Sequence, residues 1–461
     1  MKERKLQQKE RKLQRSMKPI CVWALALGAI IGWGCFVLPG NAFLPKAGPL
    51  GLVWGMTIGA ALILVIAFCY GYLIRKFPLS GGEFIYTKTF FGKGNAFICG
   101  WAMVLAYWSL VPLNATALGL ISRYLFPVLQ FGKLYEVAGW PVYTGELLTA
   151  SFFIVLVAVI NIWGIKKAAW TQTAVALTLV GTVVLLAALC LAKGPDFSNL
   201  QPGFPTGANQ WEAIFAIVAM APWAFIGFDC IPQAAEEYDF KPKKATFLLV
   251  SAVVIAALLY ITVNTVTAVM MPWEDLLAAK HNWPTGYIVA TYLGKFGLWV
   301  LGIAMFCAVF SGMNAFYMAT SRLLYAMAKQ NALPKWFGHL NKKGVPNYAI
   351  LFVMILSLVA PWFGREVLGW IVDMTSVGAA VVFTYTTAAS AVLAYRHHQP
   401  FRVATGVVGC LFSLFFIVLL VVPGMPGFLA LPSWISLGAW VVMGVAFFLV
   451  IRKKYYGKKD N

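Results

Sequence analysis

Long stretches without a charged side chain alternate with short charged segments along the whole chain. A helix needs about 20 apolar residues to cross a bilayer. Nine charge-free windows are of about that length: 19–45, 47–74, 94–122, 147–165, 168–192, 245–273, 296–321, 344–364 and 374–395. A shorter window, 213–228, ends at Asp229, and the last, 403–451, is divided by the turn-forming stretch PGMPG at 423–427. The pattern therefore predicts twelve transmembrane helices, with both termini on one side of the membrane.

Composition and charge placement agree with this pattern and give an orientation. Hydrophobic residues make up 61% of the chain and charged residues 11%, a balance typical of membrane proteins. With a cytoplasmic N-terminus, the cytoplasmic segments carry 29 Lys and Arg residues and the external loops carry 7. This positive-inside bias predicts a multi-pass protein of the cell membrane, plasma or inner, with both termini cytoplasmic. We expect the basic tail 1–18 to lie against anionic lipid, and nucleic acid is not an expected partner.

The sequence does not carry a pattern typical of catalysis or metal binding. The eight Cys residues are scattered without a Cys-x-x-Cys pair, and the four His residues lie in or beside charged loops. Buried small hydrophobes and solvated loop residues account for these positions. A membrane enzyme would need a spaced cluster of His, Asp or Glu, and an ion channel would need polar rings along a pore. We therefore expect no enzyme activity, no metal and no cofactor, with H⁺ or Na⁺ as the candidate coupling ion.

Two of the apolar windows contain residues that interrupt a helix. The first includes GAIIGWGCFVLPG at 28–40, with four Gly residues and a Pro. The sixth reads APWAFIGFDCIPQAAEE at 221–237 and has two Pro residues, a Gly and an Asp within eleven residues. Close helix packing is one interpretation of the first stretch, because Gly28 and Gly32 have small-xxx-small spacing. The other is unwound backbone, which mid-membrane segments tolerate only where it is buried in protein or lines a cavity.

The corresponding interruption in both halves of the chain favours unwound backbone. Discontinuous helices that meet at the midplane are typical of transporters built from two inverted repeats. Half-helix N-termini suit a carboxylate, and freed carbonyls suit an ammonium group, so a zwitterion fits such a site. We expect an all-α membrane protein of 12 transmembrane helices, a 5+5 inverted repeat with broken helices 1 and 6, plus helices 11 and 12. The expected segments are a basic cytoplasmic tail 1–18, repeats 19–192 and 193–396, helices 11–12 at 397–452, and a basic cytoplasmic tail 453–461.

Five stretches, in order along the chain, resemble motifs of the amino acid–polyamine–organocation superfamily of permeases, which share the leucine-transporter fold. They are GAIIGWGCFVLPG at 28–40, YGYLIRKFPLSGGEFIYTKTFFG at 70–92, NIWGIKK at 161–167, FIGFDCIPQAAEE at 225–237 and NAFYMATSRLLYAMAKQNALP at 314–334. The resemblance implies secondary active transport of a small amino acid or amino-acid-like zwitterion by alternating access, either proton-coupled or by exchange. A polyamine or organic-cation permease, a sodium-coupled amino acid symporter and a non-transporting receptor of the same fold remain alternatives.

The resemblance also implies a substrate site, position by position. Family members bind the substrate carboxylate on backbone N–H groups of the first break, and the amino group on carbonyls of both breaks. Aromatic residues from helices three, six and eight close over the substrate side chain. The matching positions are Ile30, Gly32, Trp33, Gly34, Tyr107, Asn114, Trp223, Ala224, Ile226 and Phe316.

This chain departs from the family pattern at two positions. The residue between the glycines of the first break is usually small, and here it is Trp33. An indole there either fills much of the pocket or acts as a gate, which favours a small substrate. Many members carry Lys or Arg nine residues after the loop Asn161, where this chain has Trp170. This difference argues against a proton mechanism that runs through a basic residue at that position.

Ionisable and polar residues within the windows are candidates for ion coupling. Asp229 corresponds to a Glu of the family's sixth helix, and a buried carboxylate at that depth should bind a proton or a cation. Capping of the second half-helix, or pairing with helix two or three, is the alternative role of Asp229. Ser311 with the carbonyls of Ala24 and Leu27 could form a sodium site of oxygen atoms.

Four charged residues near the expected cytoplasmic surface are candidates for a gate that opens and closes by ion pairing: Glu83, Glu236, Glu237 and Arg322. Solvated loop charge is the alternative for each of the three acids. Helices 11 and 12 lie outside the two repeats, and we expect them to face lipid or to form a dimer face. The expected partners are thus the zwitterionic substrate and the lipid bilayer, with a homodimer or a partner subunit left open.

Overall fold

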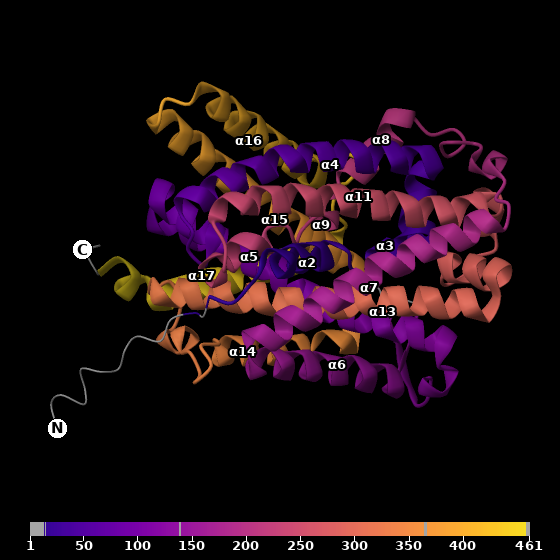
Figure 1. Ribbon diagram of the computed structural model, residues 1–461, viewed down its shortest axis with the longest axis horizontal. Coiled ribbons are helices and arrows are strands. Elements are labelled where there is room, and N and C mark those ends of the chain that lie inside the picture. Colours follow the sequence, from indigo (N-terminus) through magenta and orange to yellow (C-terminus); the bar gives the residue numbers. More distant parts are fainter. Residues whose placement is uncertain (1–12, 14, 138–139, 364–366, 458–461) are drawn as a thin grey trace.

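The computed structural model describes residue 13 and residues 15–137, 140–363 and 367–457. The described chain is a bundle of long helices that run mostly along one axis (Figure 1). The chain enters the first helix and leaves the last one at the same end of this bundle, here called the terminal end (Figure 1). The prediction that both termini share a side therefore agrees with the course of the chain.

The first half of the chain contains two helices interrupted by glycine. Helices α4 and α5 each continue across a residue with non-helical backbone, Gly48 and Gly92 respectively, so each consists of two helical segments. Gly164, with a φ of 137°, separates the next two helices. The helices of this half are α2 (Pro19–Ile30), α3 (Gly34–Leu38), a π-helical turn (Pro39–Phe43), α4 (Leu44–Lys76), α5 (Gly82–Leu125), α6 (Thr144–Trp163) and α7 (Ile165–Ala192).

The second half of the chain also combines long helices with an interrupted one, which consists of the short helices α8, α9 and α10. Helix α13 contains a non-helical residue at Gly294. The elements are α8 (Gln210–Val218), α9 (Ala221–Ala224), α10 (Cys230–Gln233), α11 (Ala245–Val269), α12 (Trp273–Ala278), α13 (Pro284–Lys329), α14 (Asn347–Ser357), α15 (Val367–Arg396), α16 (Pro400–Val421) and α17 (Leu431–Gly457). Strands β1 (Lys133–Val137) and β2 (Trp140–Tyr143) form an antiparallel hairpin between α5 and α6.

The described residues include nine helical segments that are long and apolar enough to span a membrane, and α2 to α4 count as one of these segments. Helices α8 to α10 and α14 are each shorter than a full span. The structure thus supports an all-α, multi-pass membrane protein. The count of twelve spans, the inverted repeat and the segment boundaries stay predictions.

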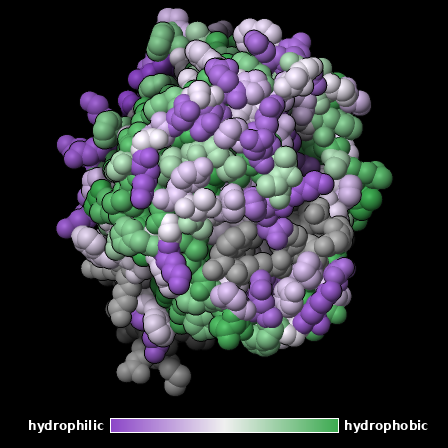
Figure 2. Space-filling model, turned by 90° about the vertical axis from the view of Figure 1, so that its right-hand side faces the viewer, coloured by the Kyte–Doolittle hydropathy of each residue, from purple (hydrophilic) through white to green (hydrophobic). Residues whose placement is uncertain are grey.

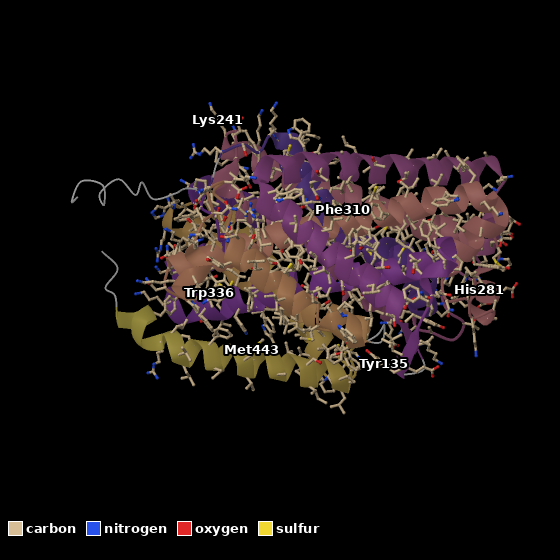
Figure 3. All side chains as sticks on the ribbon, turned by 90° about the horizontal axis from the view of Figure 1, so that it is seen from below. Tyr135, Lys241, His281, Phe310, Trp336 and Met443 are labelled. Carbon is tan, nitrogen blue, oxygen red and sulfur yellow. The ribbon has the colours of Figure 1, made fainter. Side chains whose placement is uncertain are left out.

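The two ends of the bundle are polar and its flank is apolar. Lys241 and Trp336 lie toward the terminal end, and His281 and Tyr135 lie toward the far end (Figure 3). The view onto the far end shows hydrophilic side chains gathered over the end face and apolar ones toward its rim (Figure 2). This distribution is the one that a bilayer imposes, because hydrocarbon contacts only the flank.

Helices α5 and α13 form the centre of the bundle. Most of each is buried, and they pack against each other and against α7, α15 and α2. Only 33% of the apolar window of α16 and 17% of that of α17 are buried. The role of helices 11 and 12, facing lipid or another protein chain, stays a prediction.

Candidate functional site

The first interrupted helix is broken between Ile30 and Gly34, as the glycine pattern predicts. Helix α2 ends at Ile30, and α3 begins four residues later. Within the break the amide of Gly32 donates to the Ile30 carbonyl at 3.1 Å. The Trp33 amide donates to Oδ1 of Asn114, on α5, at 3.5 Å. The break is therefore held open by a polar side chain from a neighbouring helix.

The second break lies between α9 and α10 and touches the first. Gly227 has a φ of 127°, a conformation that a residue with a side chain rarely adopts. A Cβ atom at this position would lie 2.6 Å from the Cβ of Ala29 and 2.7 Å from the amide nitrogen of Ile30. The backbones of the two breaks are thus in direct contact in the interior of the bundle, and glycine is required for that contact.

A small cavity lies where the two breaks meet. Its volume is about 10 Å³, about the space that one water molecule needs. Seven of the ten predicted substrate-binding residues line it: Ile30, Gly32, Trp33, Asn114, Trp223, Ile226 and Phe316. The other lining residues are Ala29, Leu110 and Tyr260. In this conformation the site is closed, and a substrate can enter only if side chains move.

Two tryptophan rings fill the space between the breaks. The rings of Trp33 and Trp223 meet edge to face with centroids 6.2 Å apart. Both side chains are 5% exposed, and neither indole N–H has a hydrogen-bond partner among the described residues. Unpaired buried donors are rare in folded proteins. These two N–H groups are therefore available to acceptor atoms of a ligand.

The remaining three predicted residues lie beside the cavity and do not line it. A Cβ on Gly34 would lie 2.3 Å from the Trp223 ring, so Gly34 makes room for that indole. The Tyr107 ring packs on Phe316 with centroids 5.9 Å apart, and its buried hydroxyl has no group within hydrogen-bond distance among the described residues. Ala224 is buried at the end of α9.

The sequence analysis did not single out Tyr260, which lines the cavity from α11. Its ring contacts Phe225, directly after α9, and Phe43 of the π-helical turn. A lone tyrosine in the middle of an otherwise apolar window was the available signal. It is a weak signal, because nothing in the window indicates which face of the helix points inward.

Asp229 is fully buried at the start of α10. Its side chain makes no capping bond to that helix. Instead, Oδ1 accepts a hydrogen bond of 2.8 Å from the amide of Gly227, inside the break. Oδ2 has no hydrogen-bond partner among the described residues. The carboxyl group is thus coupled to the geometry of the break.

Each candidate sodium ligand makes a hydrogen bond, and the bonds of Ser311 and Ala24 join two helices. Ser311 Oγ donates to the Gly28 carbonyl at 3.0 Å. The Ala24 carbonyl accepts from Nε2 of Gln172, on α7, at 3.1 Å, and the Leu27 carbonyl accepts from the Ile31 amide at 2.9 Å.

A chain of neutral amides extends from this contact. Asn314 donates to Oε1 of Gln172 at 2.9 Å, and Asn161 donates to Asn314 at 2.7 Å. All three side chains are buried, and together they tie α2 to α6, α7 and α13. Trp170, in contrast, is 56% exposed on the flank of the bundle.

The four gating candidates are placed near the terminal end, but they do not form one cluster. Arg322 pairs with Glu237 at 2.8 Å, and both side chains are buried. Oε1 of Glu236 accepts from the Ser80 amide at 3.1 Å. Glu83 is fully buried and accepts from the Gln233 amide group.

The far end of the site is covered by a different contact. Trp283 is fully buried at the start of α13, and its Nε1 donates to the Phe36 carbonyl at 2.8 Å. A Cβ on Gly40 would lie 2.3 Å from Pro284. The segment between α11 and α13 therefore packs directly on α3 and closes the site from that side.

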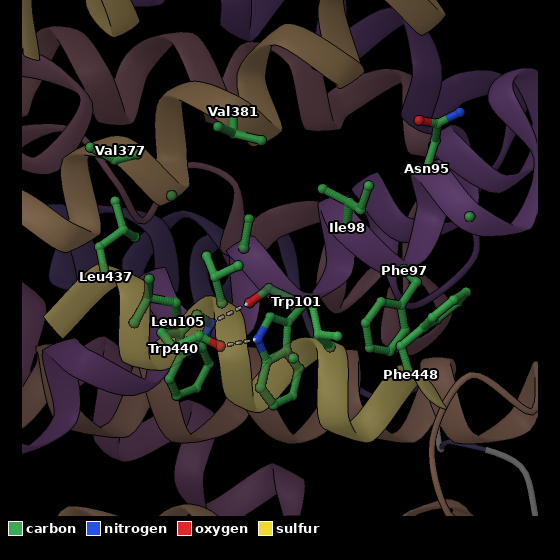
Figure 4. A pocket seen from close by; sticks show the side chains of 16 residues that line it. Asn95, Phe97, Ile98, Trp101, Leu105, Val377, Val381, Leu437, Trp440 and Phe448 are labelled. Carbon is green, nitrogen blue, oxygen red and sulfur yellow. Dashed lines mark hydrogen bonds between the residues drawn. The ribbon is translucent and has the colours of Figure 1, made fainter. Parts of the chain in front are cut away.

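A larger cavity, of about 590 Å³, lies between α5, α15 and α17 (Figure 4). Its walls are apolar, and the indole N–H groups of Trp101 and Trp440 each donate to a backbone carbonyl, at 3.1 and 3.3 Å. None of the predicted site residues lines it. Among the described residues, no group of three or more His, Cys, Asp or Glu could hold a metal ion.

Comparison with known proteins agrees with this geometry. The family model for amino acid permeases matches residues 20–448. The chain is 25% identical over 466 residues to the methylthioribose transporter of Bacillus subtilis, covering 97% of this chain and 95% of that protein. It is also 25% identical over 376 residues to the branched-chain amino acid permease BcaP of Lactococcus lactis, covering 79% and 78%. Human cationic amino acid transporter 4 is 25% identical over 407 residues, which cover 85% of this chain and 61% of that protein. The chain belongs to the amino acid permease family of the amino acid–polyamine–organocation superfamily.

Proposed function

We propose that this protein is a secondary active transporter that moves a small amino acid or an amino-acid-like zwitterion by alternating access. The observation that carries the proposal is the contact between two interrupted helices, Gly227 against Ile30, beside a buried cavity. Irregular backbone at this depth is stable only if it is buried or binds a ligand. Here it is buried and also offers unpaired donors.

The polar groups at the cavity suit the two ends of a zwitterion. Helix α3 begins beside the cavity, and the positive end of its dipole favours a carboxylate. The indole N–H groups of Trp33 and Trp223 add two neutral donors. Carbonyls at the end of α2 and in the second break favour an ammonium group. A cavity of about 10 Å³ supports a small substrate, because larger ones require larger movements of both indoles.

Closure at both ends supports alternating access. Toward the far end, Trp283 is bonded to Phe36. Toward the terminal end, Arg322 is paired with Glu237. Opening one closure while the other holds would expose the site to one side at a time. The described conformation corresponds to the occluded stage of such a cycle.

We propose proton coupling or exchange in preference to sodium coupling. Asp229 supports a proton, because it is a buried carboxyl with one unpartnered oxygen next to the break. The sodium-coupled alternative has less support, since no carboxylate is among the candidate ligands Ser311, Ala24 and Leu27, and the Gln172 amide group donates to the Ala24 carbonyl. A polyamine or organic-cation permease would need a carboxylate in the cavity wall, and Asp229 is not among the lining residues.

Uptake into proteoliposomes tests the proposal. Radiolabelled alanine is the probe, and leucine, glutamate, arginine, putrescine and methylthioribose are the competitors. The expected result is saturable uptake that small neutral amino acids inhibit. Inhibition by putrescine or methylthioribose without inhibition by any amino acid would overturn the substrate class, and binding without uptake would indicate a receptor. Gly34→Ala should abolish uptake by displacing Trp223, whereas Gly181→Ala, with no neighbour near the added methyl group, is the matched control.

A further inference from the structure

Glu83 lies in the interior of the bundle, although its sequence position is close to a charged loop. Gly81 and Gly92, both with positive φ, bound the short helical segment that carries it. The carboxyl group is fully buried. Oε2 accepts from the Gln233 amide group, and Oε1 has no hydrogen-bond partner among the described residues. A buried carboxyl with a free oxygen requires a further partner, a proton or a cation.

Asp229 is linked to Glu83 through Gln233. Gln233, which bonds Glu83, is four residues after Asp229, so both lie on one face of the α10 turn. The charge of Asp229 acts directly on the Glu83 carboxyl. Each of the two carboxyls therefore has one oxygen that accepts a hydrogen bond from the protein and one oxygen with no donor within hydrogen-bond distance among the described residues.

The groups that surround this pair are neutral. The hydroxyl of Tyr70 faces Glu83 from α4, and that of Tyr107 faces Asp229 from α5. The other titratable neighbours are the hydroxyl of Tyr86 and the thiols of Cys99 and Cys230.

The buried side chain of Arg322 is paired with another acid. Arg322 is paired with Glu237 through Nε at 2.8 Å and also donates to Ser321 at 3.0 Å. In the part of the chain that the structure describes, Asp229 and Glu83 form no salt bridge. Two adjacent buried carboxyls without a counter-ion cannot both be ionised.

We propose that Glu83 and Asp229 form a carboxyl pair that binds one proton, with Glu83 as the second proton-binding residue of the transporter. This inference rests on the proposed function and specifies its coupling ion. Binding converts a doubly charged pair into a singly charged one, and the proton returns to water when the pair becomes hydrated. The bound proton neutralises one of the two carboxyls.

The pair is connected to the substrate cavity through backbone. Asp229 holds the Gly227 amide, and Gly227 contacts Ile30 of the first break. The bond from Gln233 to Glu83 also ties α10 to the segment 82–91. Loss of the proton repels Glu83 from Asp229 and favours separation of these elements. Protonation therefore favours the closed arrangement in which the two breaks touch.

Uptake measured against pH tests the pair with four variants. Native uptake should change by about tenfold between about pH 6 and about pH 8 if one proton is coupled. Glu83→Gln and Asp229→Asn mimic a protonated carboxyl, so each should flatten this profile. Glu83→Asp keeps a titratable group and should retain the dependence. Glu212→Gln, an exposed residue in the first turn of α8, is the control.

Substrate affinity and proton movement give independent readouts. A pH-sensitive dye trapped in the proteoliposomes should report proton entry with native protein and no proton entry with Glu83→Gln. Tryptophan fluorescence should show that the two proteins bind substrate with similar affinity. A native pH profile and native proton entry in Glu83→Gln would show that Glu83 takes no part. A need for sodium or potassium at constant pH would show that the pair binds a metal cation, which also overturns the inference. The absence of uptake by native protein, in contrast, would overturn the proposed function itself.

Discussion

Gly227 and Ile30 are 197 positions apart in the sequence, yet their backbones touch: a Cβ on Gly227 would lie 2.7 Å from the Ile30 amide nitrogen. Ile30 is the last residue of α2, and Gly227 lies within the break between α9 and α10. Neither helix could be interrupted at this depth alone without exposing backbone groups to hydrocarbon. Each break therefore buries the other, and the space that remains between them is the cavity.

Gly227→Ala tests this contact. The added methyl group would meet the backbone of α2 and would stand on a residue with positive φ, a conformation that costs about 1–3 kcal/mol. We expect uptake to fall at least about tenfold, with a lower melting temperature in detergent. Gly181→Ala, on α7 in open space, should leave both unchanged. Native uptake by Gly227→Ala would mean that the contact between the breaks has no role in transport.

Trp33→Ser tests whether the indole sets the size of the substrate. Trp33 occupies the space beside Trp223 that a larger side chain would need. We expect the variant to favour leucine over alanine by about tenfold relative to native protein, because a few methylene groups in an apolar pocket discriminate by about 1–3 kcal/mol. Competition of labelled alanine uptake by unlabelled leucine measures this shift. Trp170→Ser, at an exposed position, should keep the native preference, and the same preference in both variants would exclude Trp33 as the size determinant.

Much of the helix pattern could be predicted because a bilayer imposes strong rules on composition. Charge-free windows predict α6, α7 and α11 closely, since each begins or ends near a charged residue or a glycine. The inward turn at Gly92 could not be predicted in this way. It places Glu83 in the interior, whereas the linear pattern suggests a surface loop. The sequence shows where charge lies along the chain, but burial depends on how a short segment folds back.

The residues of the candidate site, like the helices, could be predicted only in part. Backbone positions at the two breaks followed from glycine and proline, because those residues act locally. Tyr260 and Gln172 were missed, since their role depends on which face of a long apolar helix points inward. The sequence also suggested Arg322 as a common partner for several acids, but a single guanidinium is satisfied by Glu237.

Replacement of sodium by choline tests the proposed coupling. We expect uptake by native protein to be equal in both salts, because the candidate sodium ligands Ser311, Ala24 and Leu27 include no carboxylate and Gln172 donates to the Ala24 carbonyl. Uptake that requires sodium would contradict this expectation.

Gln172→Ala tests the hydrogen bond from Gln172 to the Ala24 carbonyl, one of the candidate sodium ligands. The change leaves the Ala24 carbonyl and the Asn314 amide without Gln172, at a cost of about 1–3 kcal/mol in the free energy of unfolding. Chemical denaturation in detergent measures this loss. Thr182→Ala, which removes only bonds within α7, should have a smaller effect. Equal stability of the two variants would show that the amide chain does not hold α2 in place.

Arg322→Ala tests the closure at the terminal end. The change leaves Glu237 buried without its partner, and breaking a buried pair in this way costs about 3–5 kcal/mol. The double variant Arg322→Ala/Glu237→Ala removes both charges and should be more stable than Arg322→Ala alone. Thermal unfolding in detergent compares the three proteins. Lys133→Ala breaks an exposed pair with Glu136, in which both side chains are about half exposed, and should leave the melting temperature unchanged. If Arg322→Ala were as stable as Lys133→Ala, the buried pair would not be closing that end of the site.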